Sequence, residues 1–447
     1  MTGALHDLAN ARRALDAGAV SAVELATHVL HEAGREPYGA LLAVDPEAAS
    51  APAAGPLSGI PIVVKDNIHV RNLPNTAGTR ALAGFVPQTD APLVSRLRAA
   101  GATIVAKAAM HELSLGTTGI HHGFGTVRNA TDPTRMAGGS SSGVGAAVAL
   151  GAPAGIGTDT GGSVRIPAAL NGVVGFRPST GRYPSADITP LSTSRDTPGP
   201  ITRSVRDAIV LDRLLAGAPG ASARSVPARL RLGVLRTGPM DPYVEAAFSR
   251  ALASLDRAGI ELVAVERGDE SADHRRLDAA TALPEAHHSL RAYLARHRPA
   301  LSLSELAAGV TNALVRETMR TSIVPVPDAG VEATHRAALA EVDALRHAER
   351  DCFARWTIDA LVFPTTPLPA APIVDDETVV LAGRRLSSFE AYTRLLVRGS
   401  LIGAPGLTIP IPVGAGELPV GLALDALPLD DEALLAAGML VEDALAG

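Results

Sequence analysis

Glycine, hydroxyl and charged residues follow one another in the stretch Gly157-Thr158-Asp159-Thr160-Gly161-Gly162-Ser163-Val164-Arg165-Ile166-Pro167. Glycines have no Cβ, so they let backbone N–H groups converge on a single oxygen atom, as an oxyanion hole requires. The stretch therefore predicts an oxyanion hole built from the backbone of Thr160, Gly161, Gly162 and Ser163, with the Ser163 hydroxyl beside it. A tight structural turn with no chemical role is the alternative interpretation.

A lysine ends a short apolar run in a second segment, Ile62-Val63-Val64-Lys65-Asp66-Asn67. If that run is a buried strand, Lys65 is drawn toward the interior, where burial disfavours the charged ammonium and lowers its pKa. A neutral lysine near pH 7 can act as a general base. A strand-end lysine that extends its amine into water is the competing interpretation.

A third segment, Gly138-Gly139-Ser140-Ser141-Ser142-Gly143, is rich in small residues. Such runs form flexible loops or, in particular patterns, cradle phosphate groups. The sequence lacks the pattern G-x-x-x-x-G-K-[ST], and Thr160 stands where G-x-G-x-x-G, counted from Gly155, needs its third glycine. A nucleotide-binding loop is therefore not indicated.

The histidines give no sign of a metal centre or of a Ser-His-Asp hydrolase. There are 13 of them, and none of their spacings is that of metal ligands. The stretch His111-Glu112-Leu113-Ser114-Leu115 begins like a zinc-protease motif but lacks its second histidine. The G-x-S-x-G nucleophile elbow is missing too. We expect no metal and no cofactor, and a serine mechanism based on lysine fits better.

Composition excludes several classes of protein. Hydrophobic residues make up 47% of the 447 residues, enough for a large core, and the net charge of −6 offers no basic surface for nucleic acid. A single cysteine, Cys352, permits no internal disulfide and fits a reducing compartment. Residues Met1–Val20 lack the apolar core of a signal peptide, and glycine or proline interrupts the long uncharged stretches. We expect a cytoplasmic protein that does not enter membranes.

Hydrophobic periodicity predicts alternating helices and short strands, which indicates an α/β fold around a mixed or parallel sheet. The expected helices are Leu5–Ala17, Ala22–Ala33, Pro92–Ala100, Gly143–Leu150, Ser204–Ala216, Pro242–Ala258, Leu283–Arg296, Thr334–Arg355 and Asp430–Leu445. The expected strands are Ile60–Lys65, Thr103–Ala106, Val173–Phe176, Leu230–Leu235, Ala360–Phe363, Leu407–Ile411 and Val420–Ala423. Ser21 and Glu24 have the spacing of a capping box. We expect one domain over residues 1–447, with a catalytic core at 56–216, a more helical flank at 217–447 and a loop at Ala216–Pro227.

The three segments, in this order, resemble the amidase signature family, most strongly between Pro56 and Ala216. The resemblance implies a triad in which Lys65 is the base, Ser140 the bridging serine and Ser163 the nucleophile. It also implies a cis peptide between Gly139 and Ser140. The implied fold is a single large α/β domain whose mixed central sheet, of about eleven strands, is surrounded by helices.

The resemblance extends to supporting residues and to a type of substrate. Gly138 and Gly139 would bind substrate. From the residues themselves, Asp159 is expected to anchor the oxyanion loop by accepting backbone N–H bonds, with an ordinary turn aspartate as the alternative. Arg165 is expected to hold the loop by pairing with a carboxylate such as Asp159. Several stretches look most like indoleacetamide and mandelamide hydrolases, which points to arylacetamide-type primary amides. These stretches are Met110-His111-Glu112-Leu113, Gly116-Thr117-Thr118, Gly125-Thr126-Val127-Arg128-Asn129, Phe176-Arg177-Pro178-Ser179-Thr180-Gly181-Arg182-Tyr183-Pro184 and Arg195-Asp196-Thr197-Pro198-Gly199-Pro200.

Some positions depart from the family pattern and put the substrate pocket in question. Ser142 stands where glycine is usual, Asn171 where close relatives often have cysteine, and the loop at 151–155 is one residue short. Few rings are available for an aryl pocket, because aromatic residues make up 3% of the chain; Phe124 and Phe353 are the candidates. A solvated loop is the expected setting of His121 and His122.

Two other functions remain open at the level of sequence. The same triad would serve an amidotransferase subunit that releases ammonia from glutamine for a partner enzyme. An inactive amidase-fold protein with a binding role is the other alternative, and the intact Lys65, Ser140 and Ser163 argue against it. The expected partner is a small-molecule amide, with neither nucleic acid nor membrane, and a homodimer is open.

Overall fold

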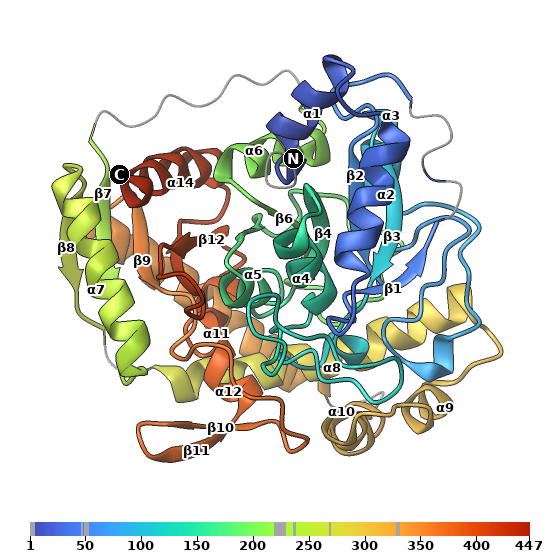
Figure 1. Ribbon diagram of the computed structural model, residues 1–447. Helices are drawn as coiled ribbons and strands as arrows, with labels where there is room; N and C mark the ends of the chain where they lie inside the picture. The colour runs from blue at the N-terminus through green and yellow to red at the C-terminus, as the bar shows by residue number, and fades with distance from the viewer. Residues whose placement is uncertain are drawn as a thin grey trace.

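A mixed sheet of eleven strands runs through the molecule in the order β1-β3-β2-β4-β6-β5-β12-β13-β9-β7-β8 (Figure 1). The computed structural model describes residues 5–45, 48, 53–218, 229–235, 238–267, 270–327 and 331–447. Strand pairs β2–β3, β2–β4, β7–β8 and β7–β9 are parallel, and the others are antiparallel. The strands are β1 Leu41–Val44, β2 Pro61–Lys65, β3 Thr103–Ala108, β4 Ala154–Asp159, β5 Val174–Arg177, β6 Thr197–Thr202, β7 Arg231–Leu235, β8 Glu261–Val265, β9 Ala360–Pro364, β12 Gly406–Ile411 and β13 Val420–Asp425; β10 Thr378–Leu381 and β11 Arg384–Ser387 form a separate hairpin.

Helices cover the sheet on both faces (Figure 1). Alternating side chains of the central strands accordingly join different hydrophobic clusters. Ile62 and Val64 of β2 join a hydrophobic cluster with α3, α6, α7 and α14, whereas Val63 joins another with α2 and α4. A strand buried on both sides reads as a continuous apolar run, which is the signal that predicted β2. The helices are α1 Leu8–Asp16, α2 Ala22–Ala33, α3 Pro92–Ala99, α4 Ser142–Leu150, α5 Arg165–Asn171, α6 Val205–Ala216, α7 Pro242–Arg257, α8 Ser271–His297, α9 Leu303–Ala308, α10 Ala313–Thr318, α11 Val331–Trp356, α12 Ser388–Thr393, α13 Val397–Ile402 and α14 Asp431–Ala446.

The expected fold class is confirmed, and so are most of the expected elements. The capping box of α2 is present, because the Ser21 side chain accepts from the Glu24 backbone while the Glu24 carboxylate accepts from Ser21. The sheet takes strands from both the expected catalytic core and the expected flank. Residues 219–227 of the expected loop at Ala216–Pro227 lie outside the described residues. Among the helices the structure describes, none is long and apolar enough to cross a bilayer.

The sequence prediction misplaced the start of one helix and missed four strands of the central sheet, β1, β4, β6 and β8. Helix α8 begins at Ser271 rather than at Leu283, because Pro284 lies inside the helix instead of marking its start. Strand β6 was not predicted, since its sequence Thr197-Pro198-Gly199-Pro200-Ile201-Thr202 carries two prolines that cannot donate to a ladder. It nevertheless pairs with β4 along its whole length and with β5 at Thr202 and Ile201.

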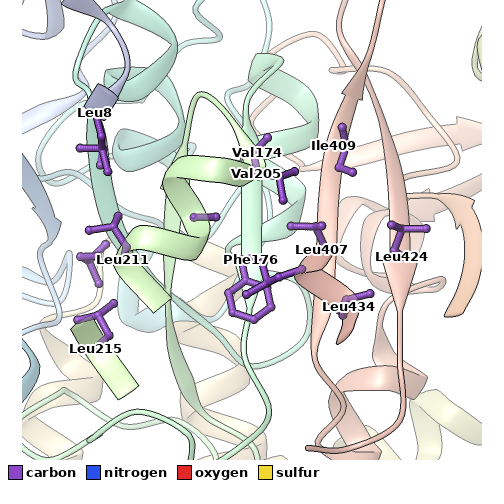
Figure 2. Close-up of a cluster of buried hydrophobic side chains, with 14 of the residues drawn as sticks. Leu8, Val174, Phe176, Val205, Leu211, Leu215, Leu407, Ile409, Leu424 and Leu434 are labelled. Atoms are coloured by element: carbon purple, nitrogen blue, oxygen red, sulfur yellow. The ribbon is translucent and has the colours of Figure 1, made fainter. Parts of the chain in front are cut away.

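The largest hydrophobic cluster joins the middle of the sheet to α6 and α14 (Figure 2). Leu407 of β12 lies directly opposite Phe176 of β5 on one side and Leu424 of β13 on the other. Gly438 lets α14 approach this point closely, since a Cβ there would come within 2.2 Å of Leu407 Cδ2. Leu407 therefore connects three strands and a helix.

Replacing Leu407 by alanine should lower the free energy of unfolding by roughly 2–5 kcal/mol, through lost apolar burial and a cavity beneath α14. Denaturant unfolding measures the change. Leu314→Ala is the matched control, because Leu314 is 47% exposed and its truncation should cost within about 0.5 kcal/mol. Equal losses in the two variants would contradict this account of the core.

Candidate active site

Lys65, the last residue of β2, is completely buried and directs its amine at two hydroxyl groups. Its Nζ lies 2.8 Å from Ser140 Oγ and 2.7 Å from Thr158 Oγ1. Burial lowers the pKa of Lys65 from 10.5 to about 7, against the opposing effect of the Asp159 and Asp196 carboxylates. The amine can therefore lose its proton near neutral pH. The competing interpretation, in which Lys65 extends its amine into water, is excluded.

The glycine–serine loop holds Ser140 in front of this lysine. The Gly139–Ser140 peptide is cis, as the family resemblance implied. Ser141 fixes the loop to β4, since its hydroxyl donates to Thr158 O and accepts from Thr158 N, both at 3.2 Å. Its backbone N–H also donates to Ser163 O at 3.1 Å. The loop therefore joins the lysine side of the site to the Ser163 turn.

Gly138 and Gly139 are required by the close packing of this loop. Gly138 has a positive φ of 78°, a conformation that costs a non-glycine residue energy. A Cβ on Gly139 would lie 3.1 Å from the Thr117 carbonyl carbon. Backbone conformation and close packing thus explain why both positions are glycine. Their expected role in binding substrate stays a prediction.

The turn at residues 160–163 presents backbone N–H groups beside Ser163. Gly161 faces open space where a side chain would be, and Ser163 is 8% exposed. Gly162 N–H already donates to Asp159 Oδ1 at 2.9 Å. The N–H groups of Thr160, Gly161 and Ser163 make no such hydrogen bond to another described residue. Gly162 thus shapes the turn, and Thr160, Gly161 and Ser163 stay the predicted donors of the oxyanion hole.

A buried carboxylate with two arginines supports this turn. Asp159 accepts from Val164 N at 3.1 Å, from Arg165 Nε at 3.1 Å and from Arg177 Nη1 at 3.1 Å. Burial alone would raise the pKa of Asp159, but the two guanidinium groups outweigh burial and hold it below its usual range. The expected pairing of Asp159 with Arg165 is confirmed. The contact of Arg177 with Asp159 was not predicted, because nothing in the sequence shows that β6 joins β4 to β5 and brings their ends within reach of each other.

Arg165 extends this network to the C-terminal part of the chain. Its Nη2 donates to Ser400 Oγ at 2.8 Å, and its Nη1 lies 3.5 Å from Asp425 Oδ1. Ser400 belongs to α13 and Asp425 to β13. The Ser163 turn is thereby fixed by residues from the sheet's centre and from the last quarter of the fold.

A cavity of about 140 Å³ lies next to Thr158 and Thr160. Thr160 Oγ1 donates to Asp196 Oδ1 at 2.6 Å, so Asp196, which the sequence could not place, lies at this cavity. Asn67 donates to Thr158 Oγ1 at 3.2 Å, while its own Oδ1 is buried without a partner among the described residues. Hydroxyl groups and small apolar side chains make up the walls, with Ser114, Ser185, Ile188, Thr189, Pro190, Leu191, Thr193, Thr197 and Pro198.

The two phenylalanines suggested for an aryl pocket lie elsewhere. Phe353 is buried in the hydrophobic cluster around α11 and β9, and Phe124 stacks under the Arg80 guanidinium. His121 is buried rather than solvated, and its Nδ1 accepts from the backbone N–H groups of Gly123 and Phe124. Neither Phe124 nor Phe353 lines the cavity beside Thr158.

The departures from the family pattern have structural explanations. Asn171 donates to Ala137 O at 2.7 Å and to Pro167 O at 2.8 Å, and so ties α5 to the start of the glycine–serine loop. The Ser142 hydroxyl packs against Gly119, where a Cβ would come within 2.6 Å. Gly151 ends α4 with a φ of 133°, and β4 starts at Ala154, so the short loop still delivers Thr158 to Lys65.

Comparison with known proteins gives consistent matches across most of the chain. A sequence model of the family described as Amidase matches residues 21–435. Mandelamide hydrolase of Pseudomonas putida is 38% identical, covering 87% of this chain and 79% of that protein. Indoleacetamide hydrolase of Rhizobium radiobacter is 37% identical, covering 87% of this chain and 84% of that protein. A crystal structure of an amidase superposes with a TM-score of 0.84 at 36% identity, covering 98% of this chain and 100% of the other.

The matches span the lysine strand, the glycine–serine loop and the Ser163 turn together. The structure adds the eleven-stranded sheet and the buried contact between Lys65 and Ser140 to these matches. Taken with the extent of the similarity, they show that this chain belongs to the amidase family, whose members hydrolyse carboxamide C–N bonds.

Proposed function

We propose that this protein hydrolyses a small primary amide to a carboxylate and ammonia through an acyl-enzyme on Ser163. The observation that carries the proposal is the 2.8 Å contact between Lys65 Nζ and Ser140 Oγ, with an amine whose pKa lies near 7. A neutral amine can accept the Ser140 proton while Ser140 accepts the proton of Ser163. The Ser163 oxygen then attacks the amide carbon.

Each group in the proposed relay then acts a second time. The oxygen that becomes negative in the tetrahedral intermediate is stabilised by the N–H groups of Thr160, Gly161 and Ser163. The proton taken up by Lys65 returns through Ser140 to the leaving nitrogen, which departs as ammonia. Water then attacks the acyl-enzyme, and the same relay accepts its proton. The carboxylate product departs, and the Ser163 hydroxyl is restored.

An arylacetamide-type amide is the proposed substrate class. Two relatives at 37% and 38% identity are hydrolases of indoleacetamide and mandelamide by name. The cavity beside Thr158 supplies apolar contacts from Ile188, Pro190 and Leu191, together with several hydroxyl groups. A flat ring on a short methylene or hydroxymethylene arm suits such mixed walls.

Substitutions in the triad should rank in a defined order. Ser163→Ala should abolish ammonia release, because the other hydroxyl of the turn, that of Thr160, is held by the Asp196 carboxylate. Lys65→Ala should lower kcat by several orders of magnitude, and Ser140→Ala should fall between Lys65→Ala and the unchanged protein. Ammonia release is the assay, and circular dichroism checks folding. Near-normal hydrolysis by Ser163→Ala would refute the assignment of the nucleophile.

The rate should follow the ionisation of Lys65. The neutral amine is the active form, so kcat/KM should rise with pH, reach half of its plateau near pH 7 and level off above it. A second buried lysine, Lys107, has a pKa lowered by burial to about 8, yet its Nζ donates to Ile68 O and Pro74 O. A midpoint near 8 would point to Lys107 instead, and a decline through pH 7 would oppose a lysine base.

A panel of amides tests the substrate class and separates it from ammonia transfer. Phenylacetamide, mandelamide and indoleacetamide should release ammonia with higher kcat/KM than acetamide, since the ring adds apolar burial in the cavity. Glutamine should be a poor substrate for the isolated chain. Preferential hydrolysis of glutamine would favour an amidotransferase subunit and overturn the proposed class.

A further inference from the structure

Three side chains from distant parts of the sequence meet outside the proposed catalytic triad. His69 follows β2, Asp187 lies between β5 and β6, and His297 ends α8. Each offers one nitrogen or oxygen atom, and these atoms lie within 4.8 Å of one another. No spacing in the sequence indicated this group, because its members belong to three separate segments.

The Asp187 carboxylate has an unused oxygen in this group. Asp187 Oδ1 is buried and has no hydrogen-bond partner among the described residues. His297 Nε2 at 3.6 Å and Arg296 Nη2 at 3.7 Å are too far from this oxygen for a hydrogen bond. A buried carboxylate oxygen costs free energy unless a cation or a donor reaches it. Asp187 Oδ1 can therefore bind a cation.

Two imidazole rings approach the same carboxylate from different elements. An unprotonated imidazole has a lone pair that a metal ion can bind. The edge-to-face arrangement of His69 and His297, with centroids 4.8 Å apart, brings both rings to the same carboxylate.

Neighbouring groups hold His69 and Asp187 in place. The Tyr293 hydroxyl lies 2.7 Å from His69 Nε2, and Asn75 Nδ2 donates to that hydroxyl at 3.2 Å. The backbone N–H of His69 donates to Asp187 O at 3.1 Å. A histidine ligand is normally oriented by such a partner on its second nitrogen. The group is thus largely preformed, with the side chain of His69 buried and those of Asp187 and His297 15% and 18% exposed.

We propose that His69, Asp187 and His297 form a binding site for a divalent first-row metal ion of the Zn²⁺ type. Two imidazoles and one carboxylate match the ligands that Zn²⁺ prefers, whereas Mg²⁺ and Ca²⁺ prefer oxygen ligands. Tetrahedral ligands of zinc lie about 3.3–3.5 Å apart. The 3.6 Å between His297 Nε2 and Asp187 Oδ1 needs little change, whereas the widest separation in the group, within 4.8 Å, must shorten when an ion binds. The partly exposed Asp187 and His297 give the ion its entry, and water completes the shell.

The bound ion ties α8 to the loop that walls the cavity. Asp187 precedes Ile188 and Thr189, which line the cavity beside Thr158. Ile188 also forms an isolated bridge with Ile68, next to His69. Metal binding therefore stabilises this wall and the end of α8 together. The site does not depend on the identity of the amide substrate.

Zinc titration of the full-length, tag-free protein after chelator treatment tests the site. Isothermal titration calorimetry should give one high-affinity Zn²⁺ per chain, and Zn²⁺ should raise Tm because it binds the folded state alone. Co²⁺ should give a visible d–d absorption, and Mg²⁺ at the same concentration should leave Tm unchanged. His297→Ala and Asp187→Asn should each weaken binding by roughly tenfold or more. His31→Ala is the matched control, since His31 is 75% exposed and lies on α2.

His69→Ala is not used, because it removes a buried ring and can unfold the protein. Asp187 and His297 are partly exposed, so their substitution should leave the fold intact. Circular dichroism and ammonia release are the checks that the His297→Ala and Asp187→Asn proteins are folded. Zinc affinity equal to that of the unchanged protein in both variants would overturn the proposal. The proposal would also be overturned if the unchanged protein bound Zn²⁺ no more tightly than the His297→Ala variant.

Discussion

Desolvation of the Lys65 amine governs the chemistry of the site. An ammonium group surrounded by protein loses its hydration, and the hydroxyls of Ser140 and Thr158 replace that hydration incompletely. The nearest carboxylates, Asp159 and Asp196, keep the pKa from falling further. The balance leaves the amine close to neutrality at physiological pH. A fold that exposed this lysine would keep it protonated and would lose its base.

The same carboxylate that moderates the lysine also builds the turn. Asp159 accepts from the backbone of Gly162 and Val164 and from two arginines, so its charge is spread over a rigid network. A buried ion network of this kind gives one conformation an advantage rather than a large net stability. Here that conformation leaves Gly161 facing open space beside the largely buried Ser163.

Much of this could be predicted from the sequence, through local patterns and family resemblance. The apolar run before Lys65 indicated a buried strand, and the order of the three segments implied the Lys65–Ser140 contact and the cis peptide at Ser140. Contacts between distant segments that neither a local pattern nor the family resemblance marks could not be predicted. The approach of Arg177 to Asp159 depends on the pairing of β4, β6 and β5, and β6 was concealed by its prolines. The meeting of His69 with His297 depends in the same way on where α8 ends.

Strand β12 pairs with β5, and so brings the C-terminal strands into the middle of a sheet that the N-terminal half begins. Ser400 and Asp425, which complete the surroundings of Arg165, also come from this last part of the chain. During synthesis, the Ser163 turn must therefore wait for nearly the whole polypeptide to leave the ribosome before its support is complete. Long-range pairing of this kind slows folding and leaves strand edges open in the meantime. In a newly made chain, the support of the Ser163 turn is therefore incomplete until α13 and β13 have docked.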